Sequence, residues 1–287
     1  MLYLHKEKMK NPFQTEEAGH WYTQTGAPRY EANLRIARKE NLLPSITETL
    51  KIYPKASLDR WIKEQGILAR HNNPPPPDAE GNVEKVSEAT DAQKVYFRHI
   101  EDLSNQIRDR AGDRGNVIHE GIEAMLLGLK WDETDPHLIA VRTWLDENLE
   151  AVHFTEKSVV DLELGVGGRL DACVQLKDSL RPIILDYKGR GFTHGPRKGW
   201  KATRRKTDLI QLAFYATTMA DPPRIANLYV ANNQAEGIIE FVEYSDEERI
   251  EAIAVLKHLV AVWRFEKKYR PAIDHEAVLA YLEGKAA

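Results

Sequence analysis

The chain has 287 residues, 42% of them hydrophobic and 29% charged, and a formal net charge of −4. These shares are typical of a globular protein, and the acidic balance means that any nucleic-acid site has to be a local basic patch. A single cysteine, Cys173, excludes a disulfide within the chain, a four-cysteine iron–sulfur cluster and a cysteine-rich zinc site.

The first part of the chain predicts a helical extension. It has no apolar segment like that of a signal peptide, and no apolar run approaches a membrane span, so we expect a cytoplasmic protein without a membrane part. Residues 33–40 and 57–68 are short helix candidates, and the polar, proline-rich stretch 71–82 predicts an exposed loop. Residues 1–70 are too few and too poor in apolar residues for an independent domain, and we assign residues 1–88 to an N-terminal extension. We expect them to pack on a domain at 89–287.

The pattern of apolar residues in the second part of the chain predicts helices first and then a sheet. Helices are expected at 89–110, at 113–129 with Asp113 as the N-cap, and at 136–149. We then expect strands at 153–164, 168–177 and 182–188, a helix at 207–220, strands at 225–231 and 237–243, and a helix at 246–269. This order predicts an α/β or α+β fold with a mixed sheet. His119 and Glu123 are four residues apart and share one helix face.

Two short segments carry the residues most suited to chemistry. Gly167-Gly168-Arg169-Leu170-Asp171 predicts a glycine bend that enters a strand, and a later apolar run ends in Asp186-Tyr187-Lys188. Side chains alternate along a strand, so Asp186 and Lys188 are expected on one side, near Asp171 on the neighbouring strand. Two carboxylates suit Mg²⁺ or Mn²⁺, and a lysine beside the metal can orient or deprotonate a water. Alternatively, both aspartates end strands and Lys188 pairs with one of them.

A basic run without acidic residues follows the second segment, over residues 189–206. Its cations could neutralise phosphates, and its tryptophan could stack on a base. The alternative is a solvated loop. The candidate nucleic-acid contacts are Arg190, Arg197, Lys198, Trp200, Lys201, Arg204, Arg205 and Lys206.

Several motifs, taken in order, resemble the PD-(D/E)XK nuclease superfamily, and within it the RecB-like and phage-type exonucleases. They are Gly115-x-x-x-His119-x-x-x-Glu123, Asp171, Asp186-x-Lys188 and Gln211-x-x-x-Tyr215. Pro44-Ser45-Ile46-Thr47 is similar to the P-S-V-T stretch of phage members. The resemblance covers about residues 33–71 and 113–245.

The resemblance implies a restriction-endonuclease-like core of α-β-β-β-α-β order, with a mixed central sheet flanked by helices. It implies one or two Mg²⁺ or Mn²⁺ ions held by His119, Asp171, Asp186 and the Tyr187 backbone carbonyl, with Glu123 as a further candidate. The implied catalytic residues are Asp171, Asp186, Lys188, Gln211 and Tyr215. From the residues alone, His119 could equally be a packed or solvated side chain, Glu123 a surface residue, Tyr215 a core residue and Gln211 a surface residue. Glu156 and Glu163 precede Asp171 on a predicted strand, and we select neither.

The first interpretation is a Mg²⁺-dependent deoxyribonuclease of a bacterial host cell, an exonuclease that acts on DNA ends in phage or prophage recombination or DNA processing. A structure-specific or restriction-like endonuclease and a non-catalytic nucleic-acid-binding module are the alternatives. The resemblance also admits a single-strand annealing protein as a partner and a homo-oligomer, although no residue specifies either.

Overall fold

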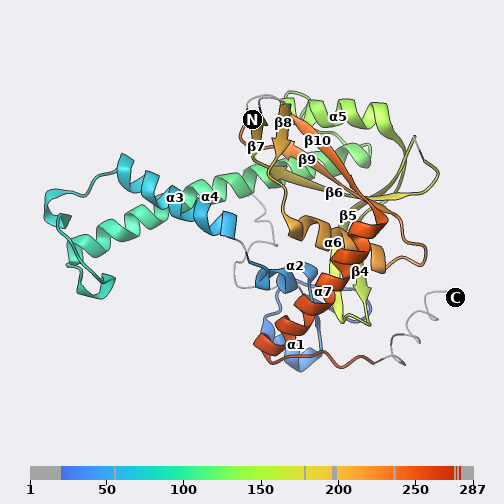
Figure 1. Ribbon diagram of the computed structural model, residues 1–287, viewed down its shortest axis with the longest axis horizontal. Coiled ribbons are helices and arrows are strands. Elements are labelled where there is room, and N and C mark those ends of the chain that lie inside the picture. The colour runs from blue at the N-terminus through green and yellow to red at the C-terminus, as the bar shows by residue number, and fades with distance from the viewer. Residues whose placement is uncertain are drawn as a thin grey trace, which may run out of the picture.

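The centre of the protein is a five-stranded mixed sheet (Figure 1). The computed structural model describes residues 21–54, 56–177, 179–195, 199–234, 237–274, 276 and 278. The sheet order is β10-β9-β6-β5-β4, in which only β6 and β9 run parallel. The strands are β4 (Leu149–Asp161), β5 (Val166–Leu176), β6 (Ile183–Arg190), β9 (Arg224–Ala231) and β10 (Ile239–Tyr244). The expected mixed α/β fold is confirmed.

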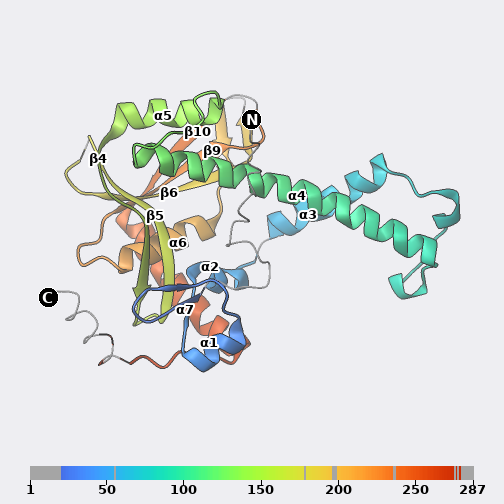
Figure 2. The ribbon, with the colours of Figure 1, turned by 180° about the vertical axis from the view of Figure 1, so that it is seen from behind.

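Helices cover both faces of this sheet, as Figures 1 and 2 show. The C-terminal half of α4 (Asp91–Leu126) and α5 (Pro136–Asn148) pack on one face through Ile118, Ile122 and Val141. On the other face, α6 (Lys206–Thr217) and α7 (Asp246–Lys267) pack against Val166 and Leu170 of β5 and Ile184 of β6. Alternation along β6 therefore decides which side chains face which helices. None of the described helices has both the length and the apolar character that crossing a membrane requires.

Residues 21–54 pack on the end of α7 and on β5. They contain β1 (Trp21–Tyr22), β2 (Pro28–Arg29), α1 (Leu34–Glu40), β3 (Leu43–Pro44), α2 (Ile46–Thr49) and the short 3₁₀ helix η1 (Leu50–Ile52). Trp21 packs edge-on against Trp263 and Tyr269. The Tyr269 hydroxyl donates to the carbonyls of Ala37 (2.9 Å) and Leu42 (2.8 Å), so one buried side chain ties this segment to the C-terminal part of the chain.

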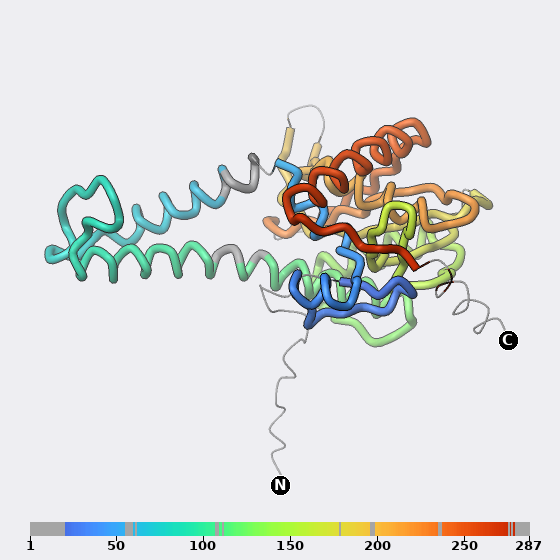
Figure 3. The backbone as a smooth tube through the Cα atoms, turned by 90° about the horizontal axis from the view of Figure 1, so that it is seen from below, coloured from blue at the N-terminus to red at the C-terminus, as the bar shows by residue number. Residues whose placement is uncertain are grey.

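A helical arm projects from the globular part (Figures 1–3). It consists of α3 (Ala56–Asn72), the 3₁₀ helices η2 (Pro77–Ala79) and η3 (Val86–Glu88), and the first half of α4. The proposed boundary between residues 88 and 89 lies inside this arm. The expected loop at 71–82 begins later than predicted, because α3 continues through His71 and Asn72.

A single helix, α4, replaces the two helices expected at 89–110 and 113–129. Thr90 caps it: its hydroxyl accepts from the Gln93 backbone N–H (3.2 Å), and the Gln93 side chain accepts from the Thr90 N–H (2.9 Å). Asp113 lies inside the helix and is not its cap. The nearby glycines cost about 1 kcal/mol each relative to alanine, which weakens a helix but does not end it as a proline would.

The basic run is also more ordered than expected. Within residues 189–206, β7 (Phe192–Gly195) and β8 (Gly199–Ala202) form an antiparallel hairpin. Phe192 is buried in a cluster with Tyr229 and Val242, and this anchors the hairpin to the sheet.

Gly167 and Gly168 lie within β5, so the expected glycine bend is absent from this strand. Their missing side chains allow close packing instead. A Cβ on Gly167 would lie 2.6 Å from the Tyr22 ring, and one on Gly168 would lie 2.8 Å from Tyr215 and 2.9 Å from Phe214. The two glycines therefore let residues 21–54 and α6 approach β5.

We expect Gly168→Ala to lower the free energy of unfolding by about 1–3 kcal/mol, because the added methyl group overpacks two buried aromatic rings. Denaturant unfolding measures the change. Gly66→Ala is the matched control, since Gly66 lies in α3 with no atom within 4 Å of an added Cβ. That control should gain up to about 1 kcal/mol. Equal stability of the two variants would contradict the close packing at Gly168.

Candidate metal centre

The candidate site lies where β5 and β6 separate. Their antiparallel pairing ends at Ala172–Leu185, one residue before Asp171 and Asp186 would face each other. The Tyr187 backbone N–H donates to Asp171 Oδ2 at 3.1 Å. The Asp171 carboxylate thus accepts from a backbone N–H that lies beyond the end of the β5–β6 pairing, and both acidic side chains lie in the gap between the two strands.

Asp186 is completely buried, and both of its oxygens have partners. Lys188 Nζ lies 2.7 Å from Oδ1, and Asn227 Nδ2 donates to Oδ2 at 2.7 Å. Strand alternation predicts the side-by-side placement of Asp186 and Lys188, and the structure confirms it. Burial raises the pKa of Asp186 to about 7. The pKa of Lys188 is also raised, because the charges of Asp186 and Asp171 outweigh the effect of burial.

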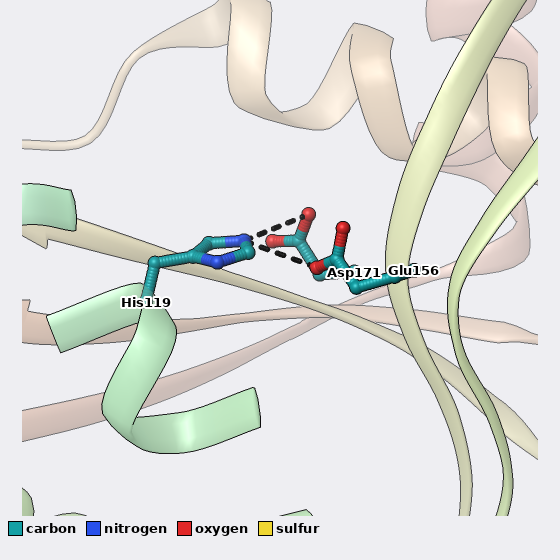
Figure 4. Close-up of side chains that lie close together, drawn as sticks. All are labelled: His119, Glu156 and Asp171. Carbon is teal, nitrogen blue, oxygen red and sulfur yellow. Dashed lines mark ion pairs between the residues drawn. The ribbon is translucent and has the colours of Figure 1, made fainter. Parts of the chain in front are cut away.

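His119 reaches the site from α4 (Figure 4). Its Nε2 lies 3.3 Å from Asp171 Oδ1 and 3.6 Å from Glu156 Oε1. The imidazole packs against the Tyr187 ring with a centroid distance of 4.6 Å. Burial alone would lower the pKa of His119, but the hydrogen bond and charge of Asp171, with the charge of Glu156, raise it.

Glu156 is the site residue that sequence reasoning did not select. It lies on β4 opposite Asp171 in the register set by Thr155–Ala172 and Lys157–Leu170. Its φ of +50° is in the left-handed region, which is unusual for a glutamate within a strand. Arg169 Nε lies 2.5 Å from Oε2, whereas the buried Oε1 has no hydrogen-bond partner among the described residues. Burial raises the pKa of Glu156 to about 7.

His119, Glu156 and Asp171 can together hold a metal ion. One ligand atom from each lies within 4.8 Å of the others, and Figure 4 shows the three side chains pointing toward one another. One imidazole and two carboxylates suit a hard or borderline divalent cation. The unpartnered Glu156 Oε1 is the kind of buried oxygen that such an ion would satisfy. Asp186 is outside this group of three, and the Tyr187 carbonyl remains a predicted ligand.

A pocket of about 600 Å³ opens beside this centre. His119, Glu123 and Glu156 line one part of it, and residues 21–54 contribute hydroxyl groups to another part. Those hydroxyl-bearing residues are Tyr22, Tyr30, Ser45 and Thr47.

Gln211 and Tyr215 also line the pocket, and they support β5. Gln211 Nε2 donates to the Tyr215 hydroxyl at 2.8 Å, and that hydroxyl donates to the Arg169 carbonyl at 2.8 Å. These contacts hold the β5 backbone at Arg169, two residues before Asp171.

The candidate nucleic-acid contacts fall into residues that already have acidic partners and residues for which no ion pair is seen within the described part of the chain. Arg190 pairs with Asp208 (2.7 Å), and both Lys201 and Arg204 reach Glu240. These three cations therefore already have acidic partners. Arg205 directly precedes α6, which begins at the exposed Lys206. Trp200 is 37% exposed and packs edge-on against His194 across the hairpin. Arg197 and Lys198 lie outside the described residues.

No protein-family model matches the chain, and no curated protein matches it in sequence. Among solved structures, it is similar to a protein from Eubacterium rectale named "Putative exonuclease", with a TM-score of 0.39, 11% identity, and coverage of 54% of this chain and 68% of that one. It is also similar to the protein SSO0001, with a TM-score of 0.30, 14% identity, and coverage of 60% and 65%. Likenesses of this size carry no functional argument.

The two raised carboxyl pKa values predict how the stability of the metal-free protein depends on pH. Glu156 and Asp186 move from ordinary values of 4.5 and 3.8 to about 7 on folding. Between these limits the folded chain holds protons that the unfolded chain has released. The free energy of unfolding therefore falls as pH rises through that window. The raised pKa of His119 acts in the same direction at its upper end.

We expect Glu156→Gln to flatten this dependence, because it removes one of the two groups. Denaturant unfolding at pH 5 and pH 8, with chelator present, measures it. Glu163→Gln, in the exposed turn after β4, is the control and should behave as the parent. An unchanged pH dependence in Glu156→Gln would show that Glu156 titrates normally in the folded protein.

Proposed function

We propose that the protein is a metal-dependent DNA nuclease of the PD-(D/E)XK type. The observation that carries the proposal is the convergence of His119, Glu156 and Asp171, with one buried glutamate oxygen that has no hydrogen bond from the described residues, beside the Asp186–Lys188 pair. This combination of a cation site and an adjacent ammonium group suits phosphodiester hydrolysis, in which negative charge develops on phosphoryl oxygens.

Each residue has a role that its environment supports. A bound Mg²⁺ or Mn²⁺ would polarise the scissile phosphate and lower the pKa of a bound water. His119, Glu156 and Asp171 would hold the ion, and Asp186 would contribute from the adjacent strand. The raised pKa of Lys188 keeps its side chain an ammonium at neutral pH. Lys188 therefore serves better to orient the water and stabilise phosphorane charge than to act as a base.

The surroundings of the centre suit a nucleic-acid substrate. Arg169 and the pocket hydroxyls of Ser45 and Thr47 can donate hydrogen bonds to phosphate oxygens. Trp200 offers an exposed ring for base stacking. Residues 21–54 line one part of the pocket and α4 another, and this favours entry of a strand end. We therefore propose an exonuclease that processes DNA ends, with recombination in phage or prophage biology as its context.

Linear and covalently closed circular DNA of one sequence test this function. With Mg²⁺ or Mn²⁺ the protein should degrade the linear form and leave the circle intact, and excess chelator should abolish the reaction. Cleavage of the circle would instead indicate an endonuclease. Failure to cut either form while Mn²⁺ binds would indicate a non-catalytic binding module, and full activity in chelator would contradict the metal centre.

Lys188→Ala should reduce the single-turnover cleavage rate by about 10²-fold or more, because it removes the positive charge beside the reacting phosphate. DNA affinity measured with Ca²⁺ should change little. Lys177→Ala is the matched control: that lysine, just past the far end of β5, donates to the Asp146 carbonyl. If Lys188→Ala folds and cleaves at the parental rate, Lys188 is only a structural partner of Asp186.

A further inference from the structure

Asp186 has a neighbour on β9 that the proposed chemistry does not use. β6, β9 and β10 lie side by side in the sheet (Figure 1), and the parallel register places Asn227 of β9 directly beside Asp186 of β6. Asn227 is fully buried, as Asp186 is. Its Nδ2 donates to Asp186 Oδ2 at 2.7 Å and lies 3.3 Å from the Asp186 backbone carbonyl.

Two tyrosines fix the orientation of this amide. The Tyr244 hydroxyl donates to Asn227 Oδ1 at 2.9 Å, and the Tyr229 hydroxyl, whose single proton Asn227 Oδ1 and Asp208 Oδ2 can both accept, lies 3.2 Å from Oδ1. The carboxylate and carbonyl oxygens of Asp186 only accept hydrogen bonds, and of the two ends of an amide only the NH₂ group donates. Oδ1 must therefore face the tyrosines, and Nδ2 must face Asp186. If the Asn227 amide could flip, it would turn Oδ1 toward Asp186 and could not donate a hydrogen bond to the carboxylate.

The network continues past the tyrosines to the base of the hairpin. The Tyr229 hydroxyl lies 3.2 Å from Asp208 Oδ2, and Asp208 Oδ1 accepts from Arg190 at 2.7 Å. Asp208 also accepts from the Arg205 backbone N–H at the start of α6. The tyrosine end of the network is thus tied to rigid elements, and the amide end is the part that touches the candidate metal centre.

We propose that Asn227 is a positioning residue that sets the orientation of the Asp186 carboxylate for metal binding and catalysis. This inference rests on the proposed function. With Oδ2 held by Asn227 and Oδ1 beside Lys188, the carboxylate cannot rotate, and the remaining lone pairs keep fixed directions. Fixed partners of this kind commonly change metal affinity or activity by 10–100-fold when they are removed.

Asn227→Leu tests the proposal, because leucine keeps a similar volume and removes the donor. Mn²⁺ affinity by titration calorimetry should fall by roughly 10–100-fold, and kcat for DNA cleavage should fall while KM for DNA stays near the parental value. A residue that only held the strands together would lower stability and leave Mn²⁺ affinity unchanged. Thermal unfolding identifies a variant that does not fold.

A second variant keeps the proposal falsifiable if Asn227→Leu does not fold. Tyr229→Phe combined with Tyr244→Phe retains both rings and Asn227 but frees the amide, so Mn²⁺ affinity and kcat should again fall. Tyr269→Phe is the matched control, since its hydroxyl donates to two carbonyls in a part of the chain remote from this network. It should lose stability and keep parental Mn²⁺ affinity and kcat.

A folded Asn227 or double tyrosine variant with parental Mn²⁺ affinity and kcat would overturn the proposal. Failure of this proposal can be distinguished from failure of the proposed nuclease function. A parent protein that binds Mn²⁺ without cleaving DNA would defeat the nuclease function and leave metal affinity to decide the role of Asn227. A parent that binds no Mn²⁺ would contradict both.

Discussion

The burial of three carboxylates at the point where β5 and β6 separate is the constraint on which the rest of the site depends. An isolated buried charge costs several kcal/mol even after relaxation, so each carboxylate needs partners. Asp171 is paired with His119 and accepts a hydrogen bond from a backbone N–H. Asp186 is paired with Lys188 and accepts a hydrogen bond from Asn227. Glu156 is paired with Arg169. The partners come from α4 and from three of the five strands, β5, β6 and β9. The site is therefore a product of the whole core, and local changes in any of these elements affect its charge balance.

The N-terminal residues and α6 complete the site from outside the sheet. Tyr22 packs on Gly167, and Ser45 pairs with the same glycine through an isolated parallel bridge. From the other side, Tyr215 packs on Gly168 and holds the Arg169 carbonyl. Two adjacent glycines thus receive side chains from two distant parts of the sequence. Because those same parts line the pocket, the packing that stabilises β5 also shapes the space beside the candidate metal centre.

The features that the sequence predicted correctly follow from local periodicity. Alternation along β6 is enough to place Lys188 beside Asp186. The order of helices and strands along the chain and the mixed sheet follow from the succession of apolar runs. None of these inferences needs the register between strands.

The features that were missed depend on pairing or on continuity. Glu156 faces Asp171 only because of the β4–β5 register, which one sequence does not reveal. The acidic partners of Arg190, Lys201 and Arg204 lie on α6 and β10, so three of the five described cations in a run without acidic residues are paired in space. The unbroken α4 was missed because a cluster of glycines and an aspartate looks like a helix boundary, whereas the real cap is Thr90. The sequence placed Glu156 and Glu163 on the strand before Asp171, but only the register shows that Glu156 is the one that faces it.

Glu156 also gives the strongest physical reason to regard the centre as functional. Its left-handed backbone costs roughly 1–2 kcal/mol for a residue with a side chain, and its unpartnered buried oxygen costs about 1–3 kcal/mol more. A glycine at this position would remove both costs. Glu156 thus combines backbone strain with an unsatisfied polar atom, beside a histidine and a second carboxylate. Neither feature stabilises the metal-free chain. A bound cation would change that balance, because it would satisfy the free oxygen and favour the ionised form of a carboxyl group that burial otherwise keeps partly protonated.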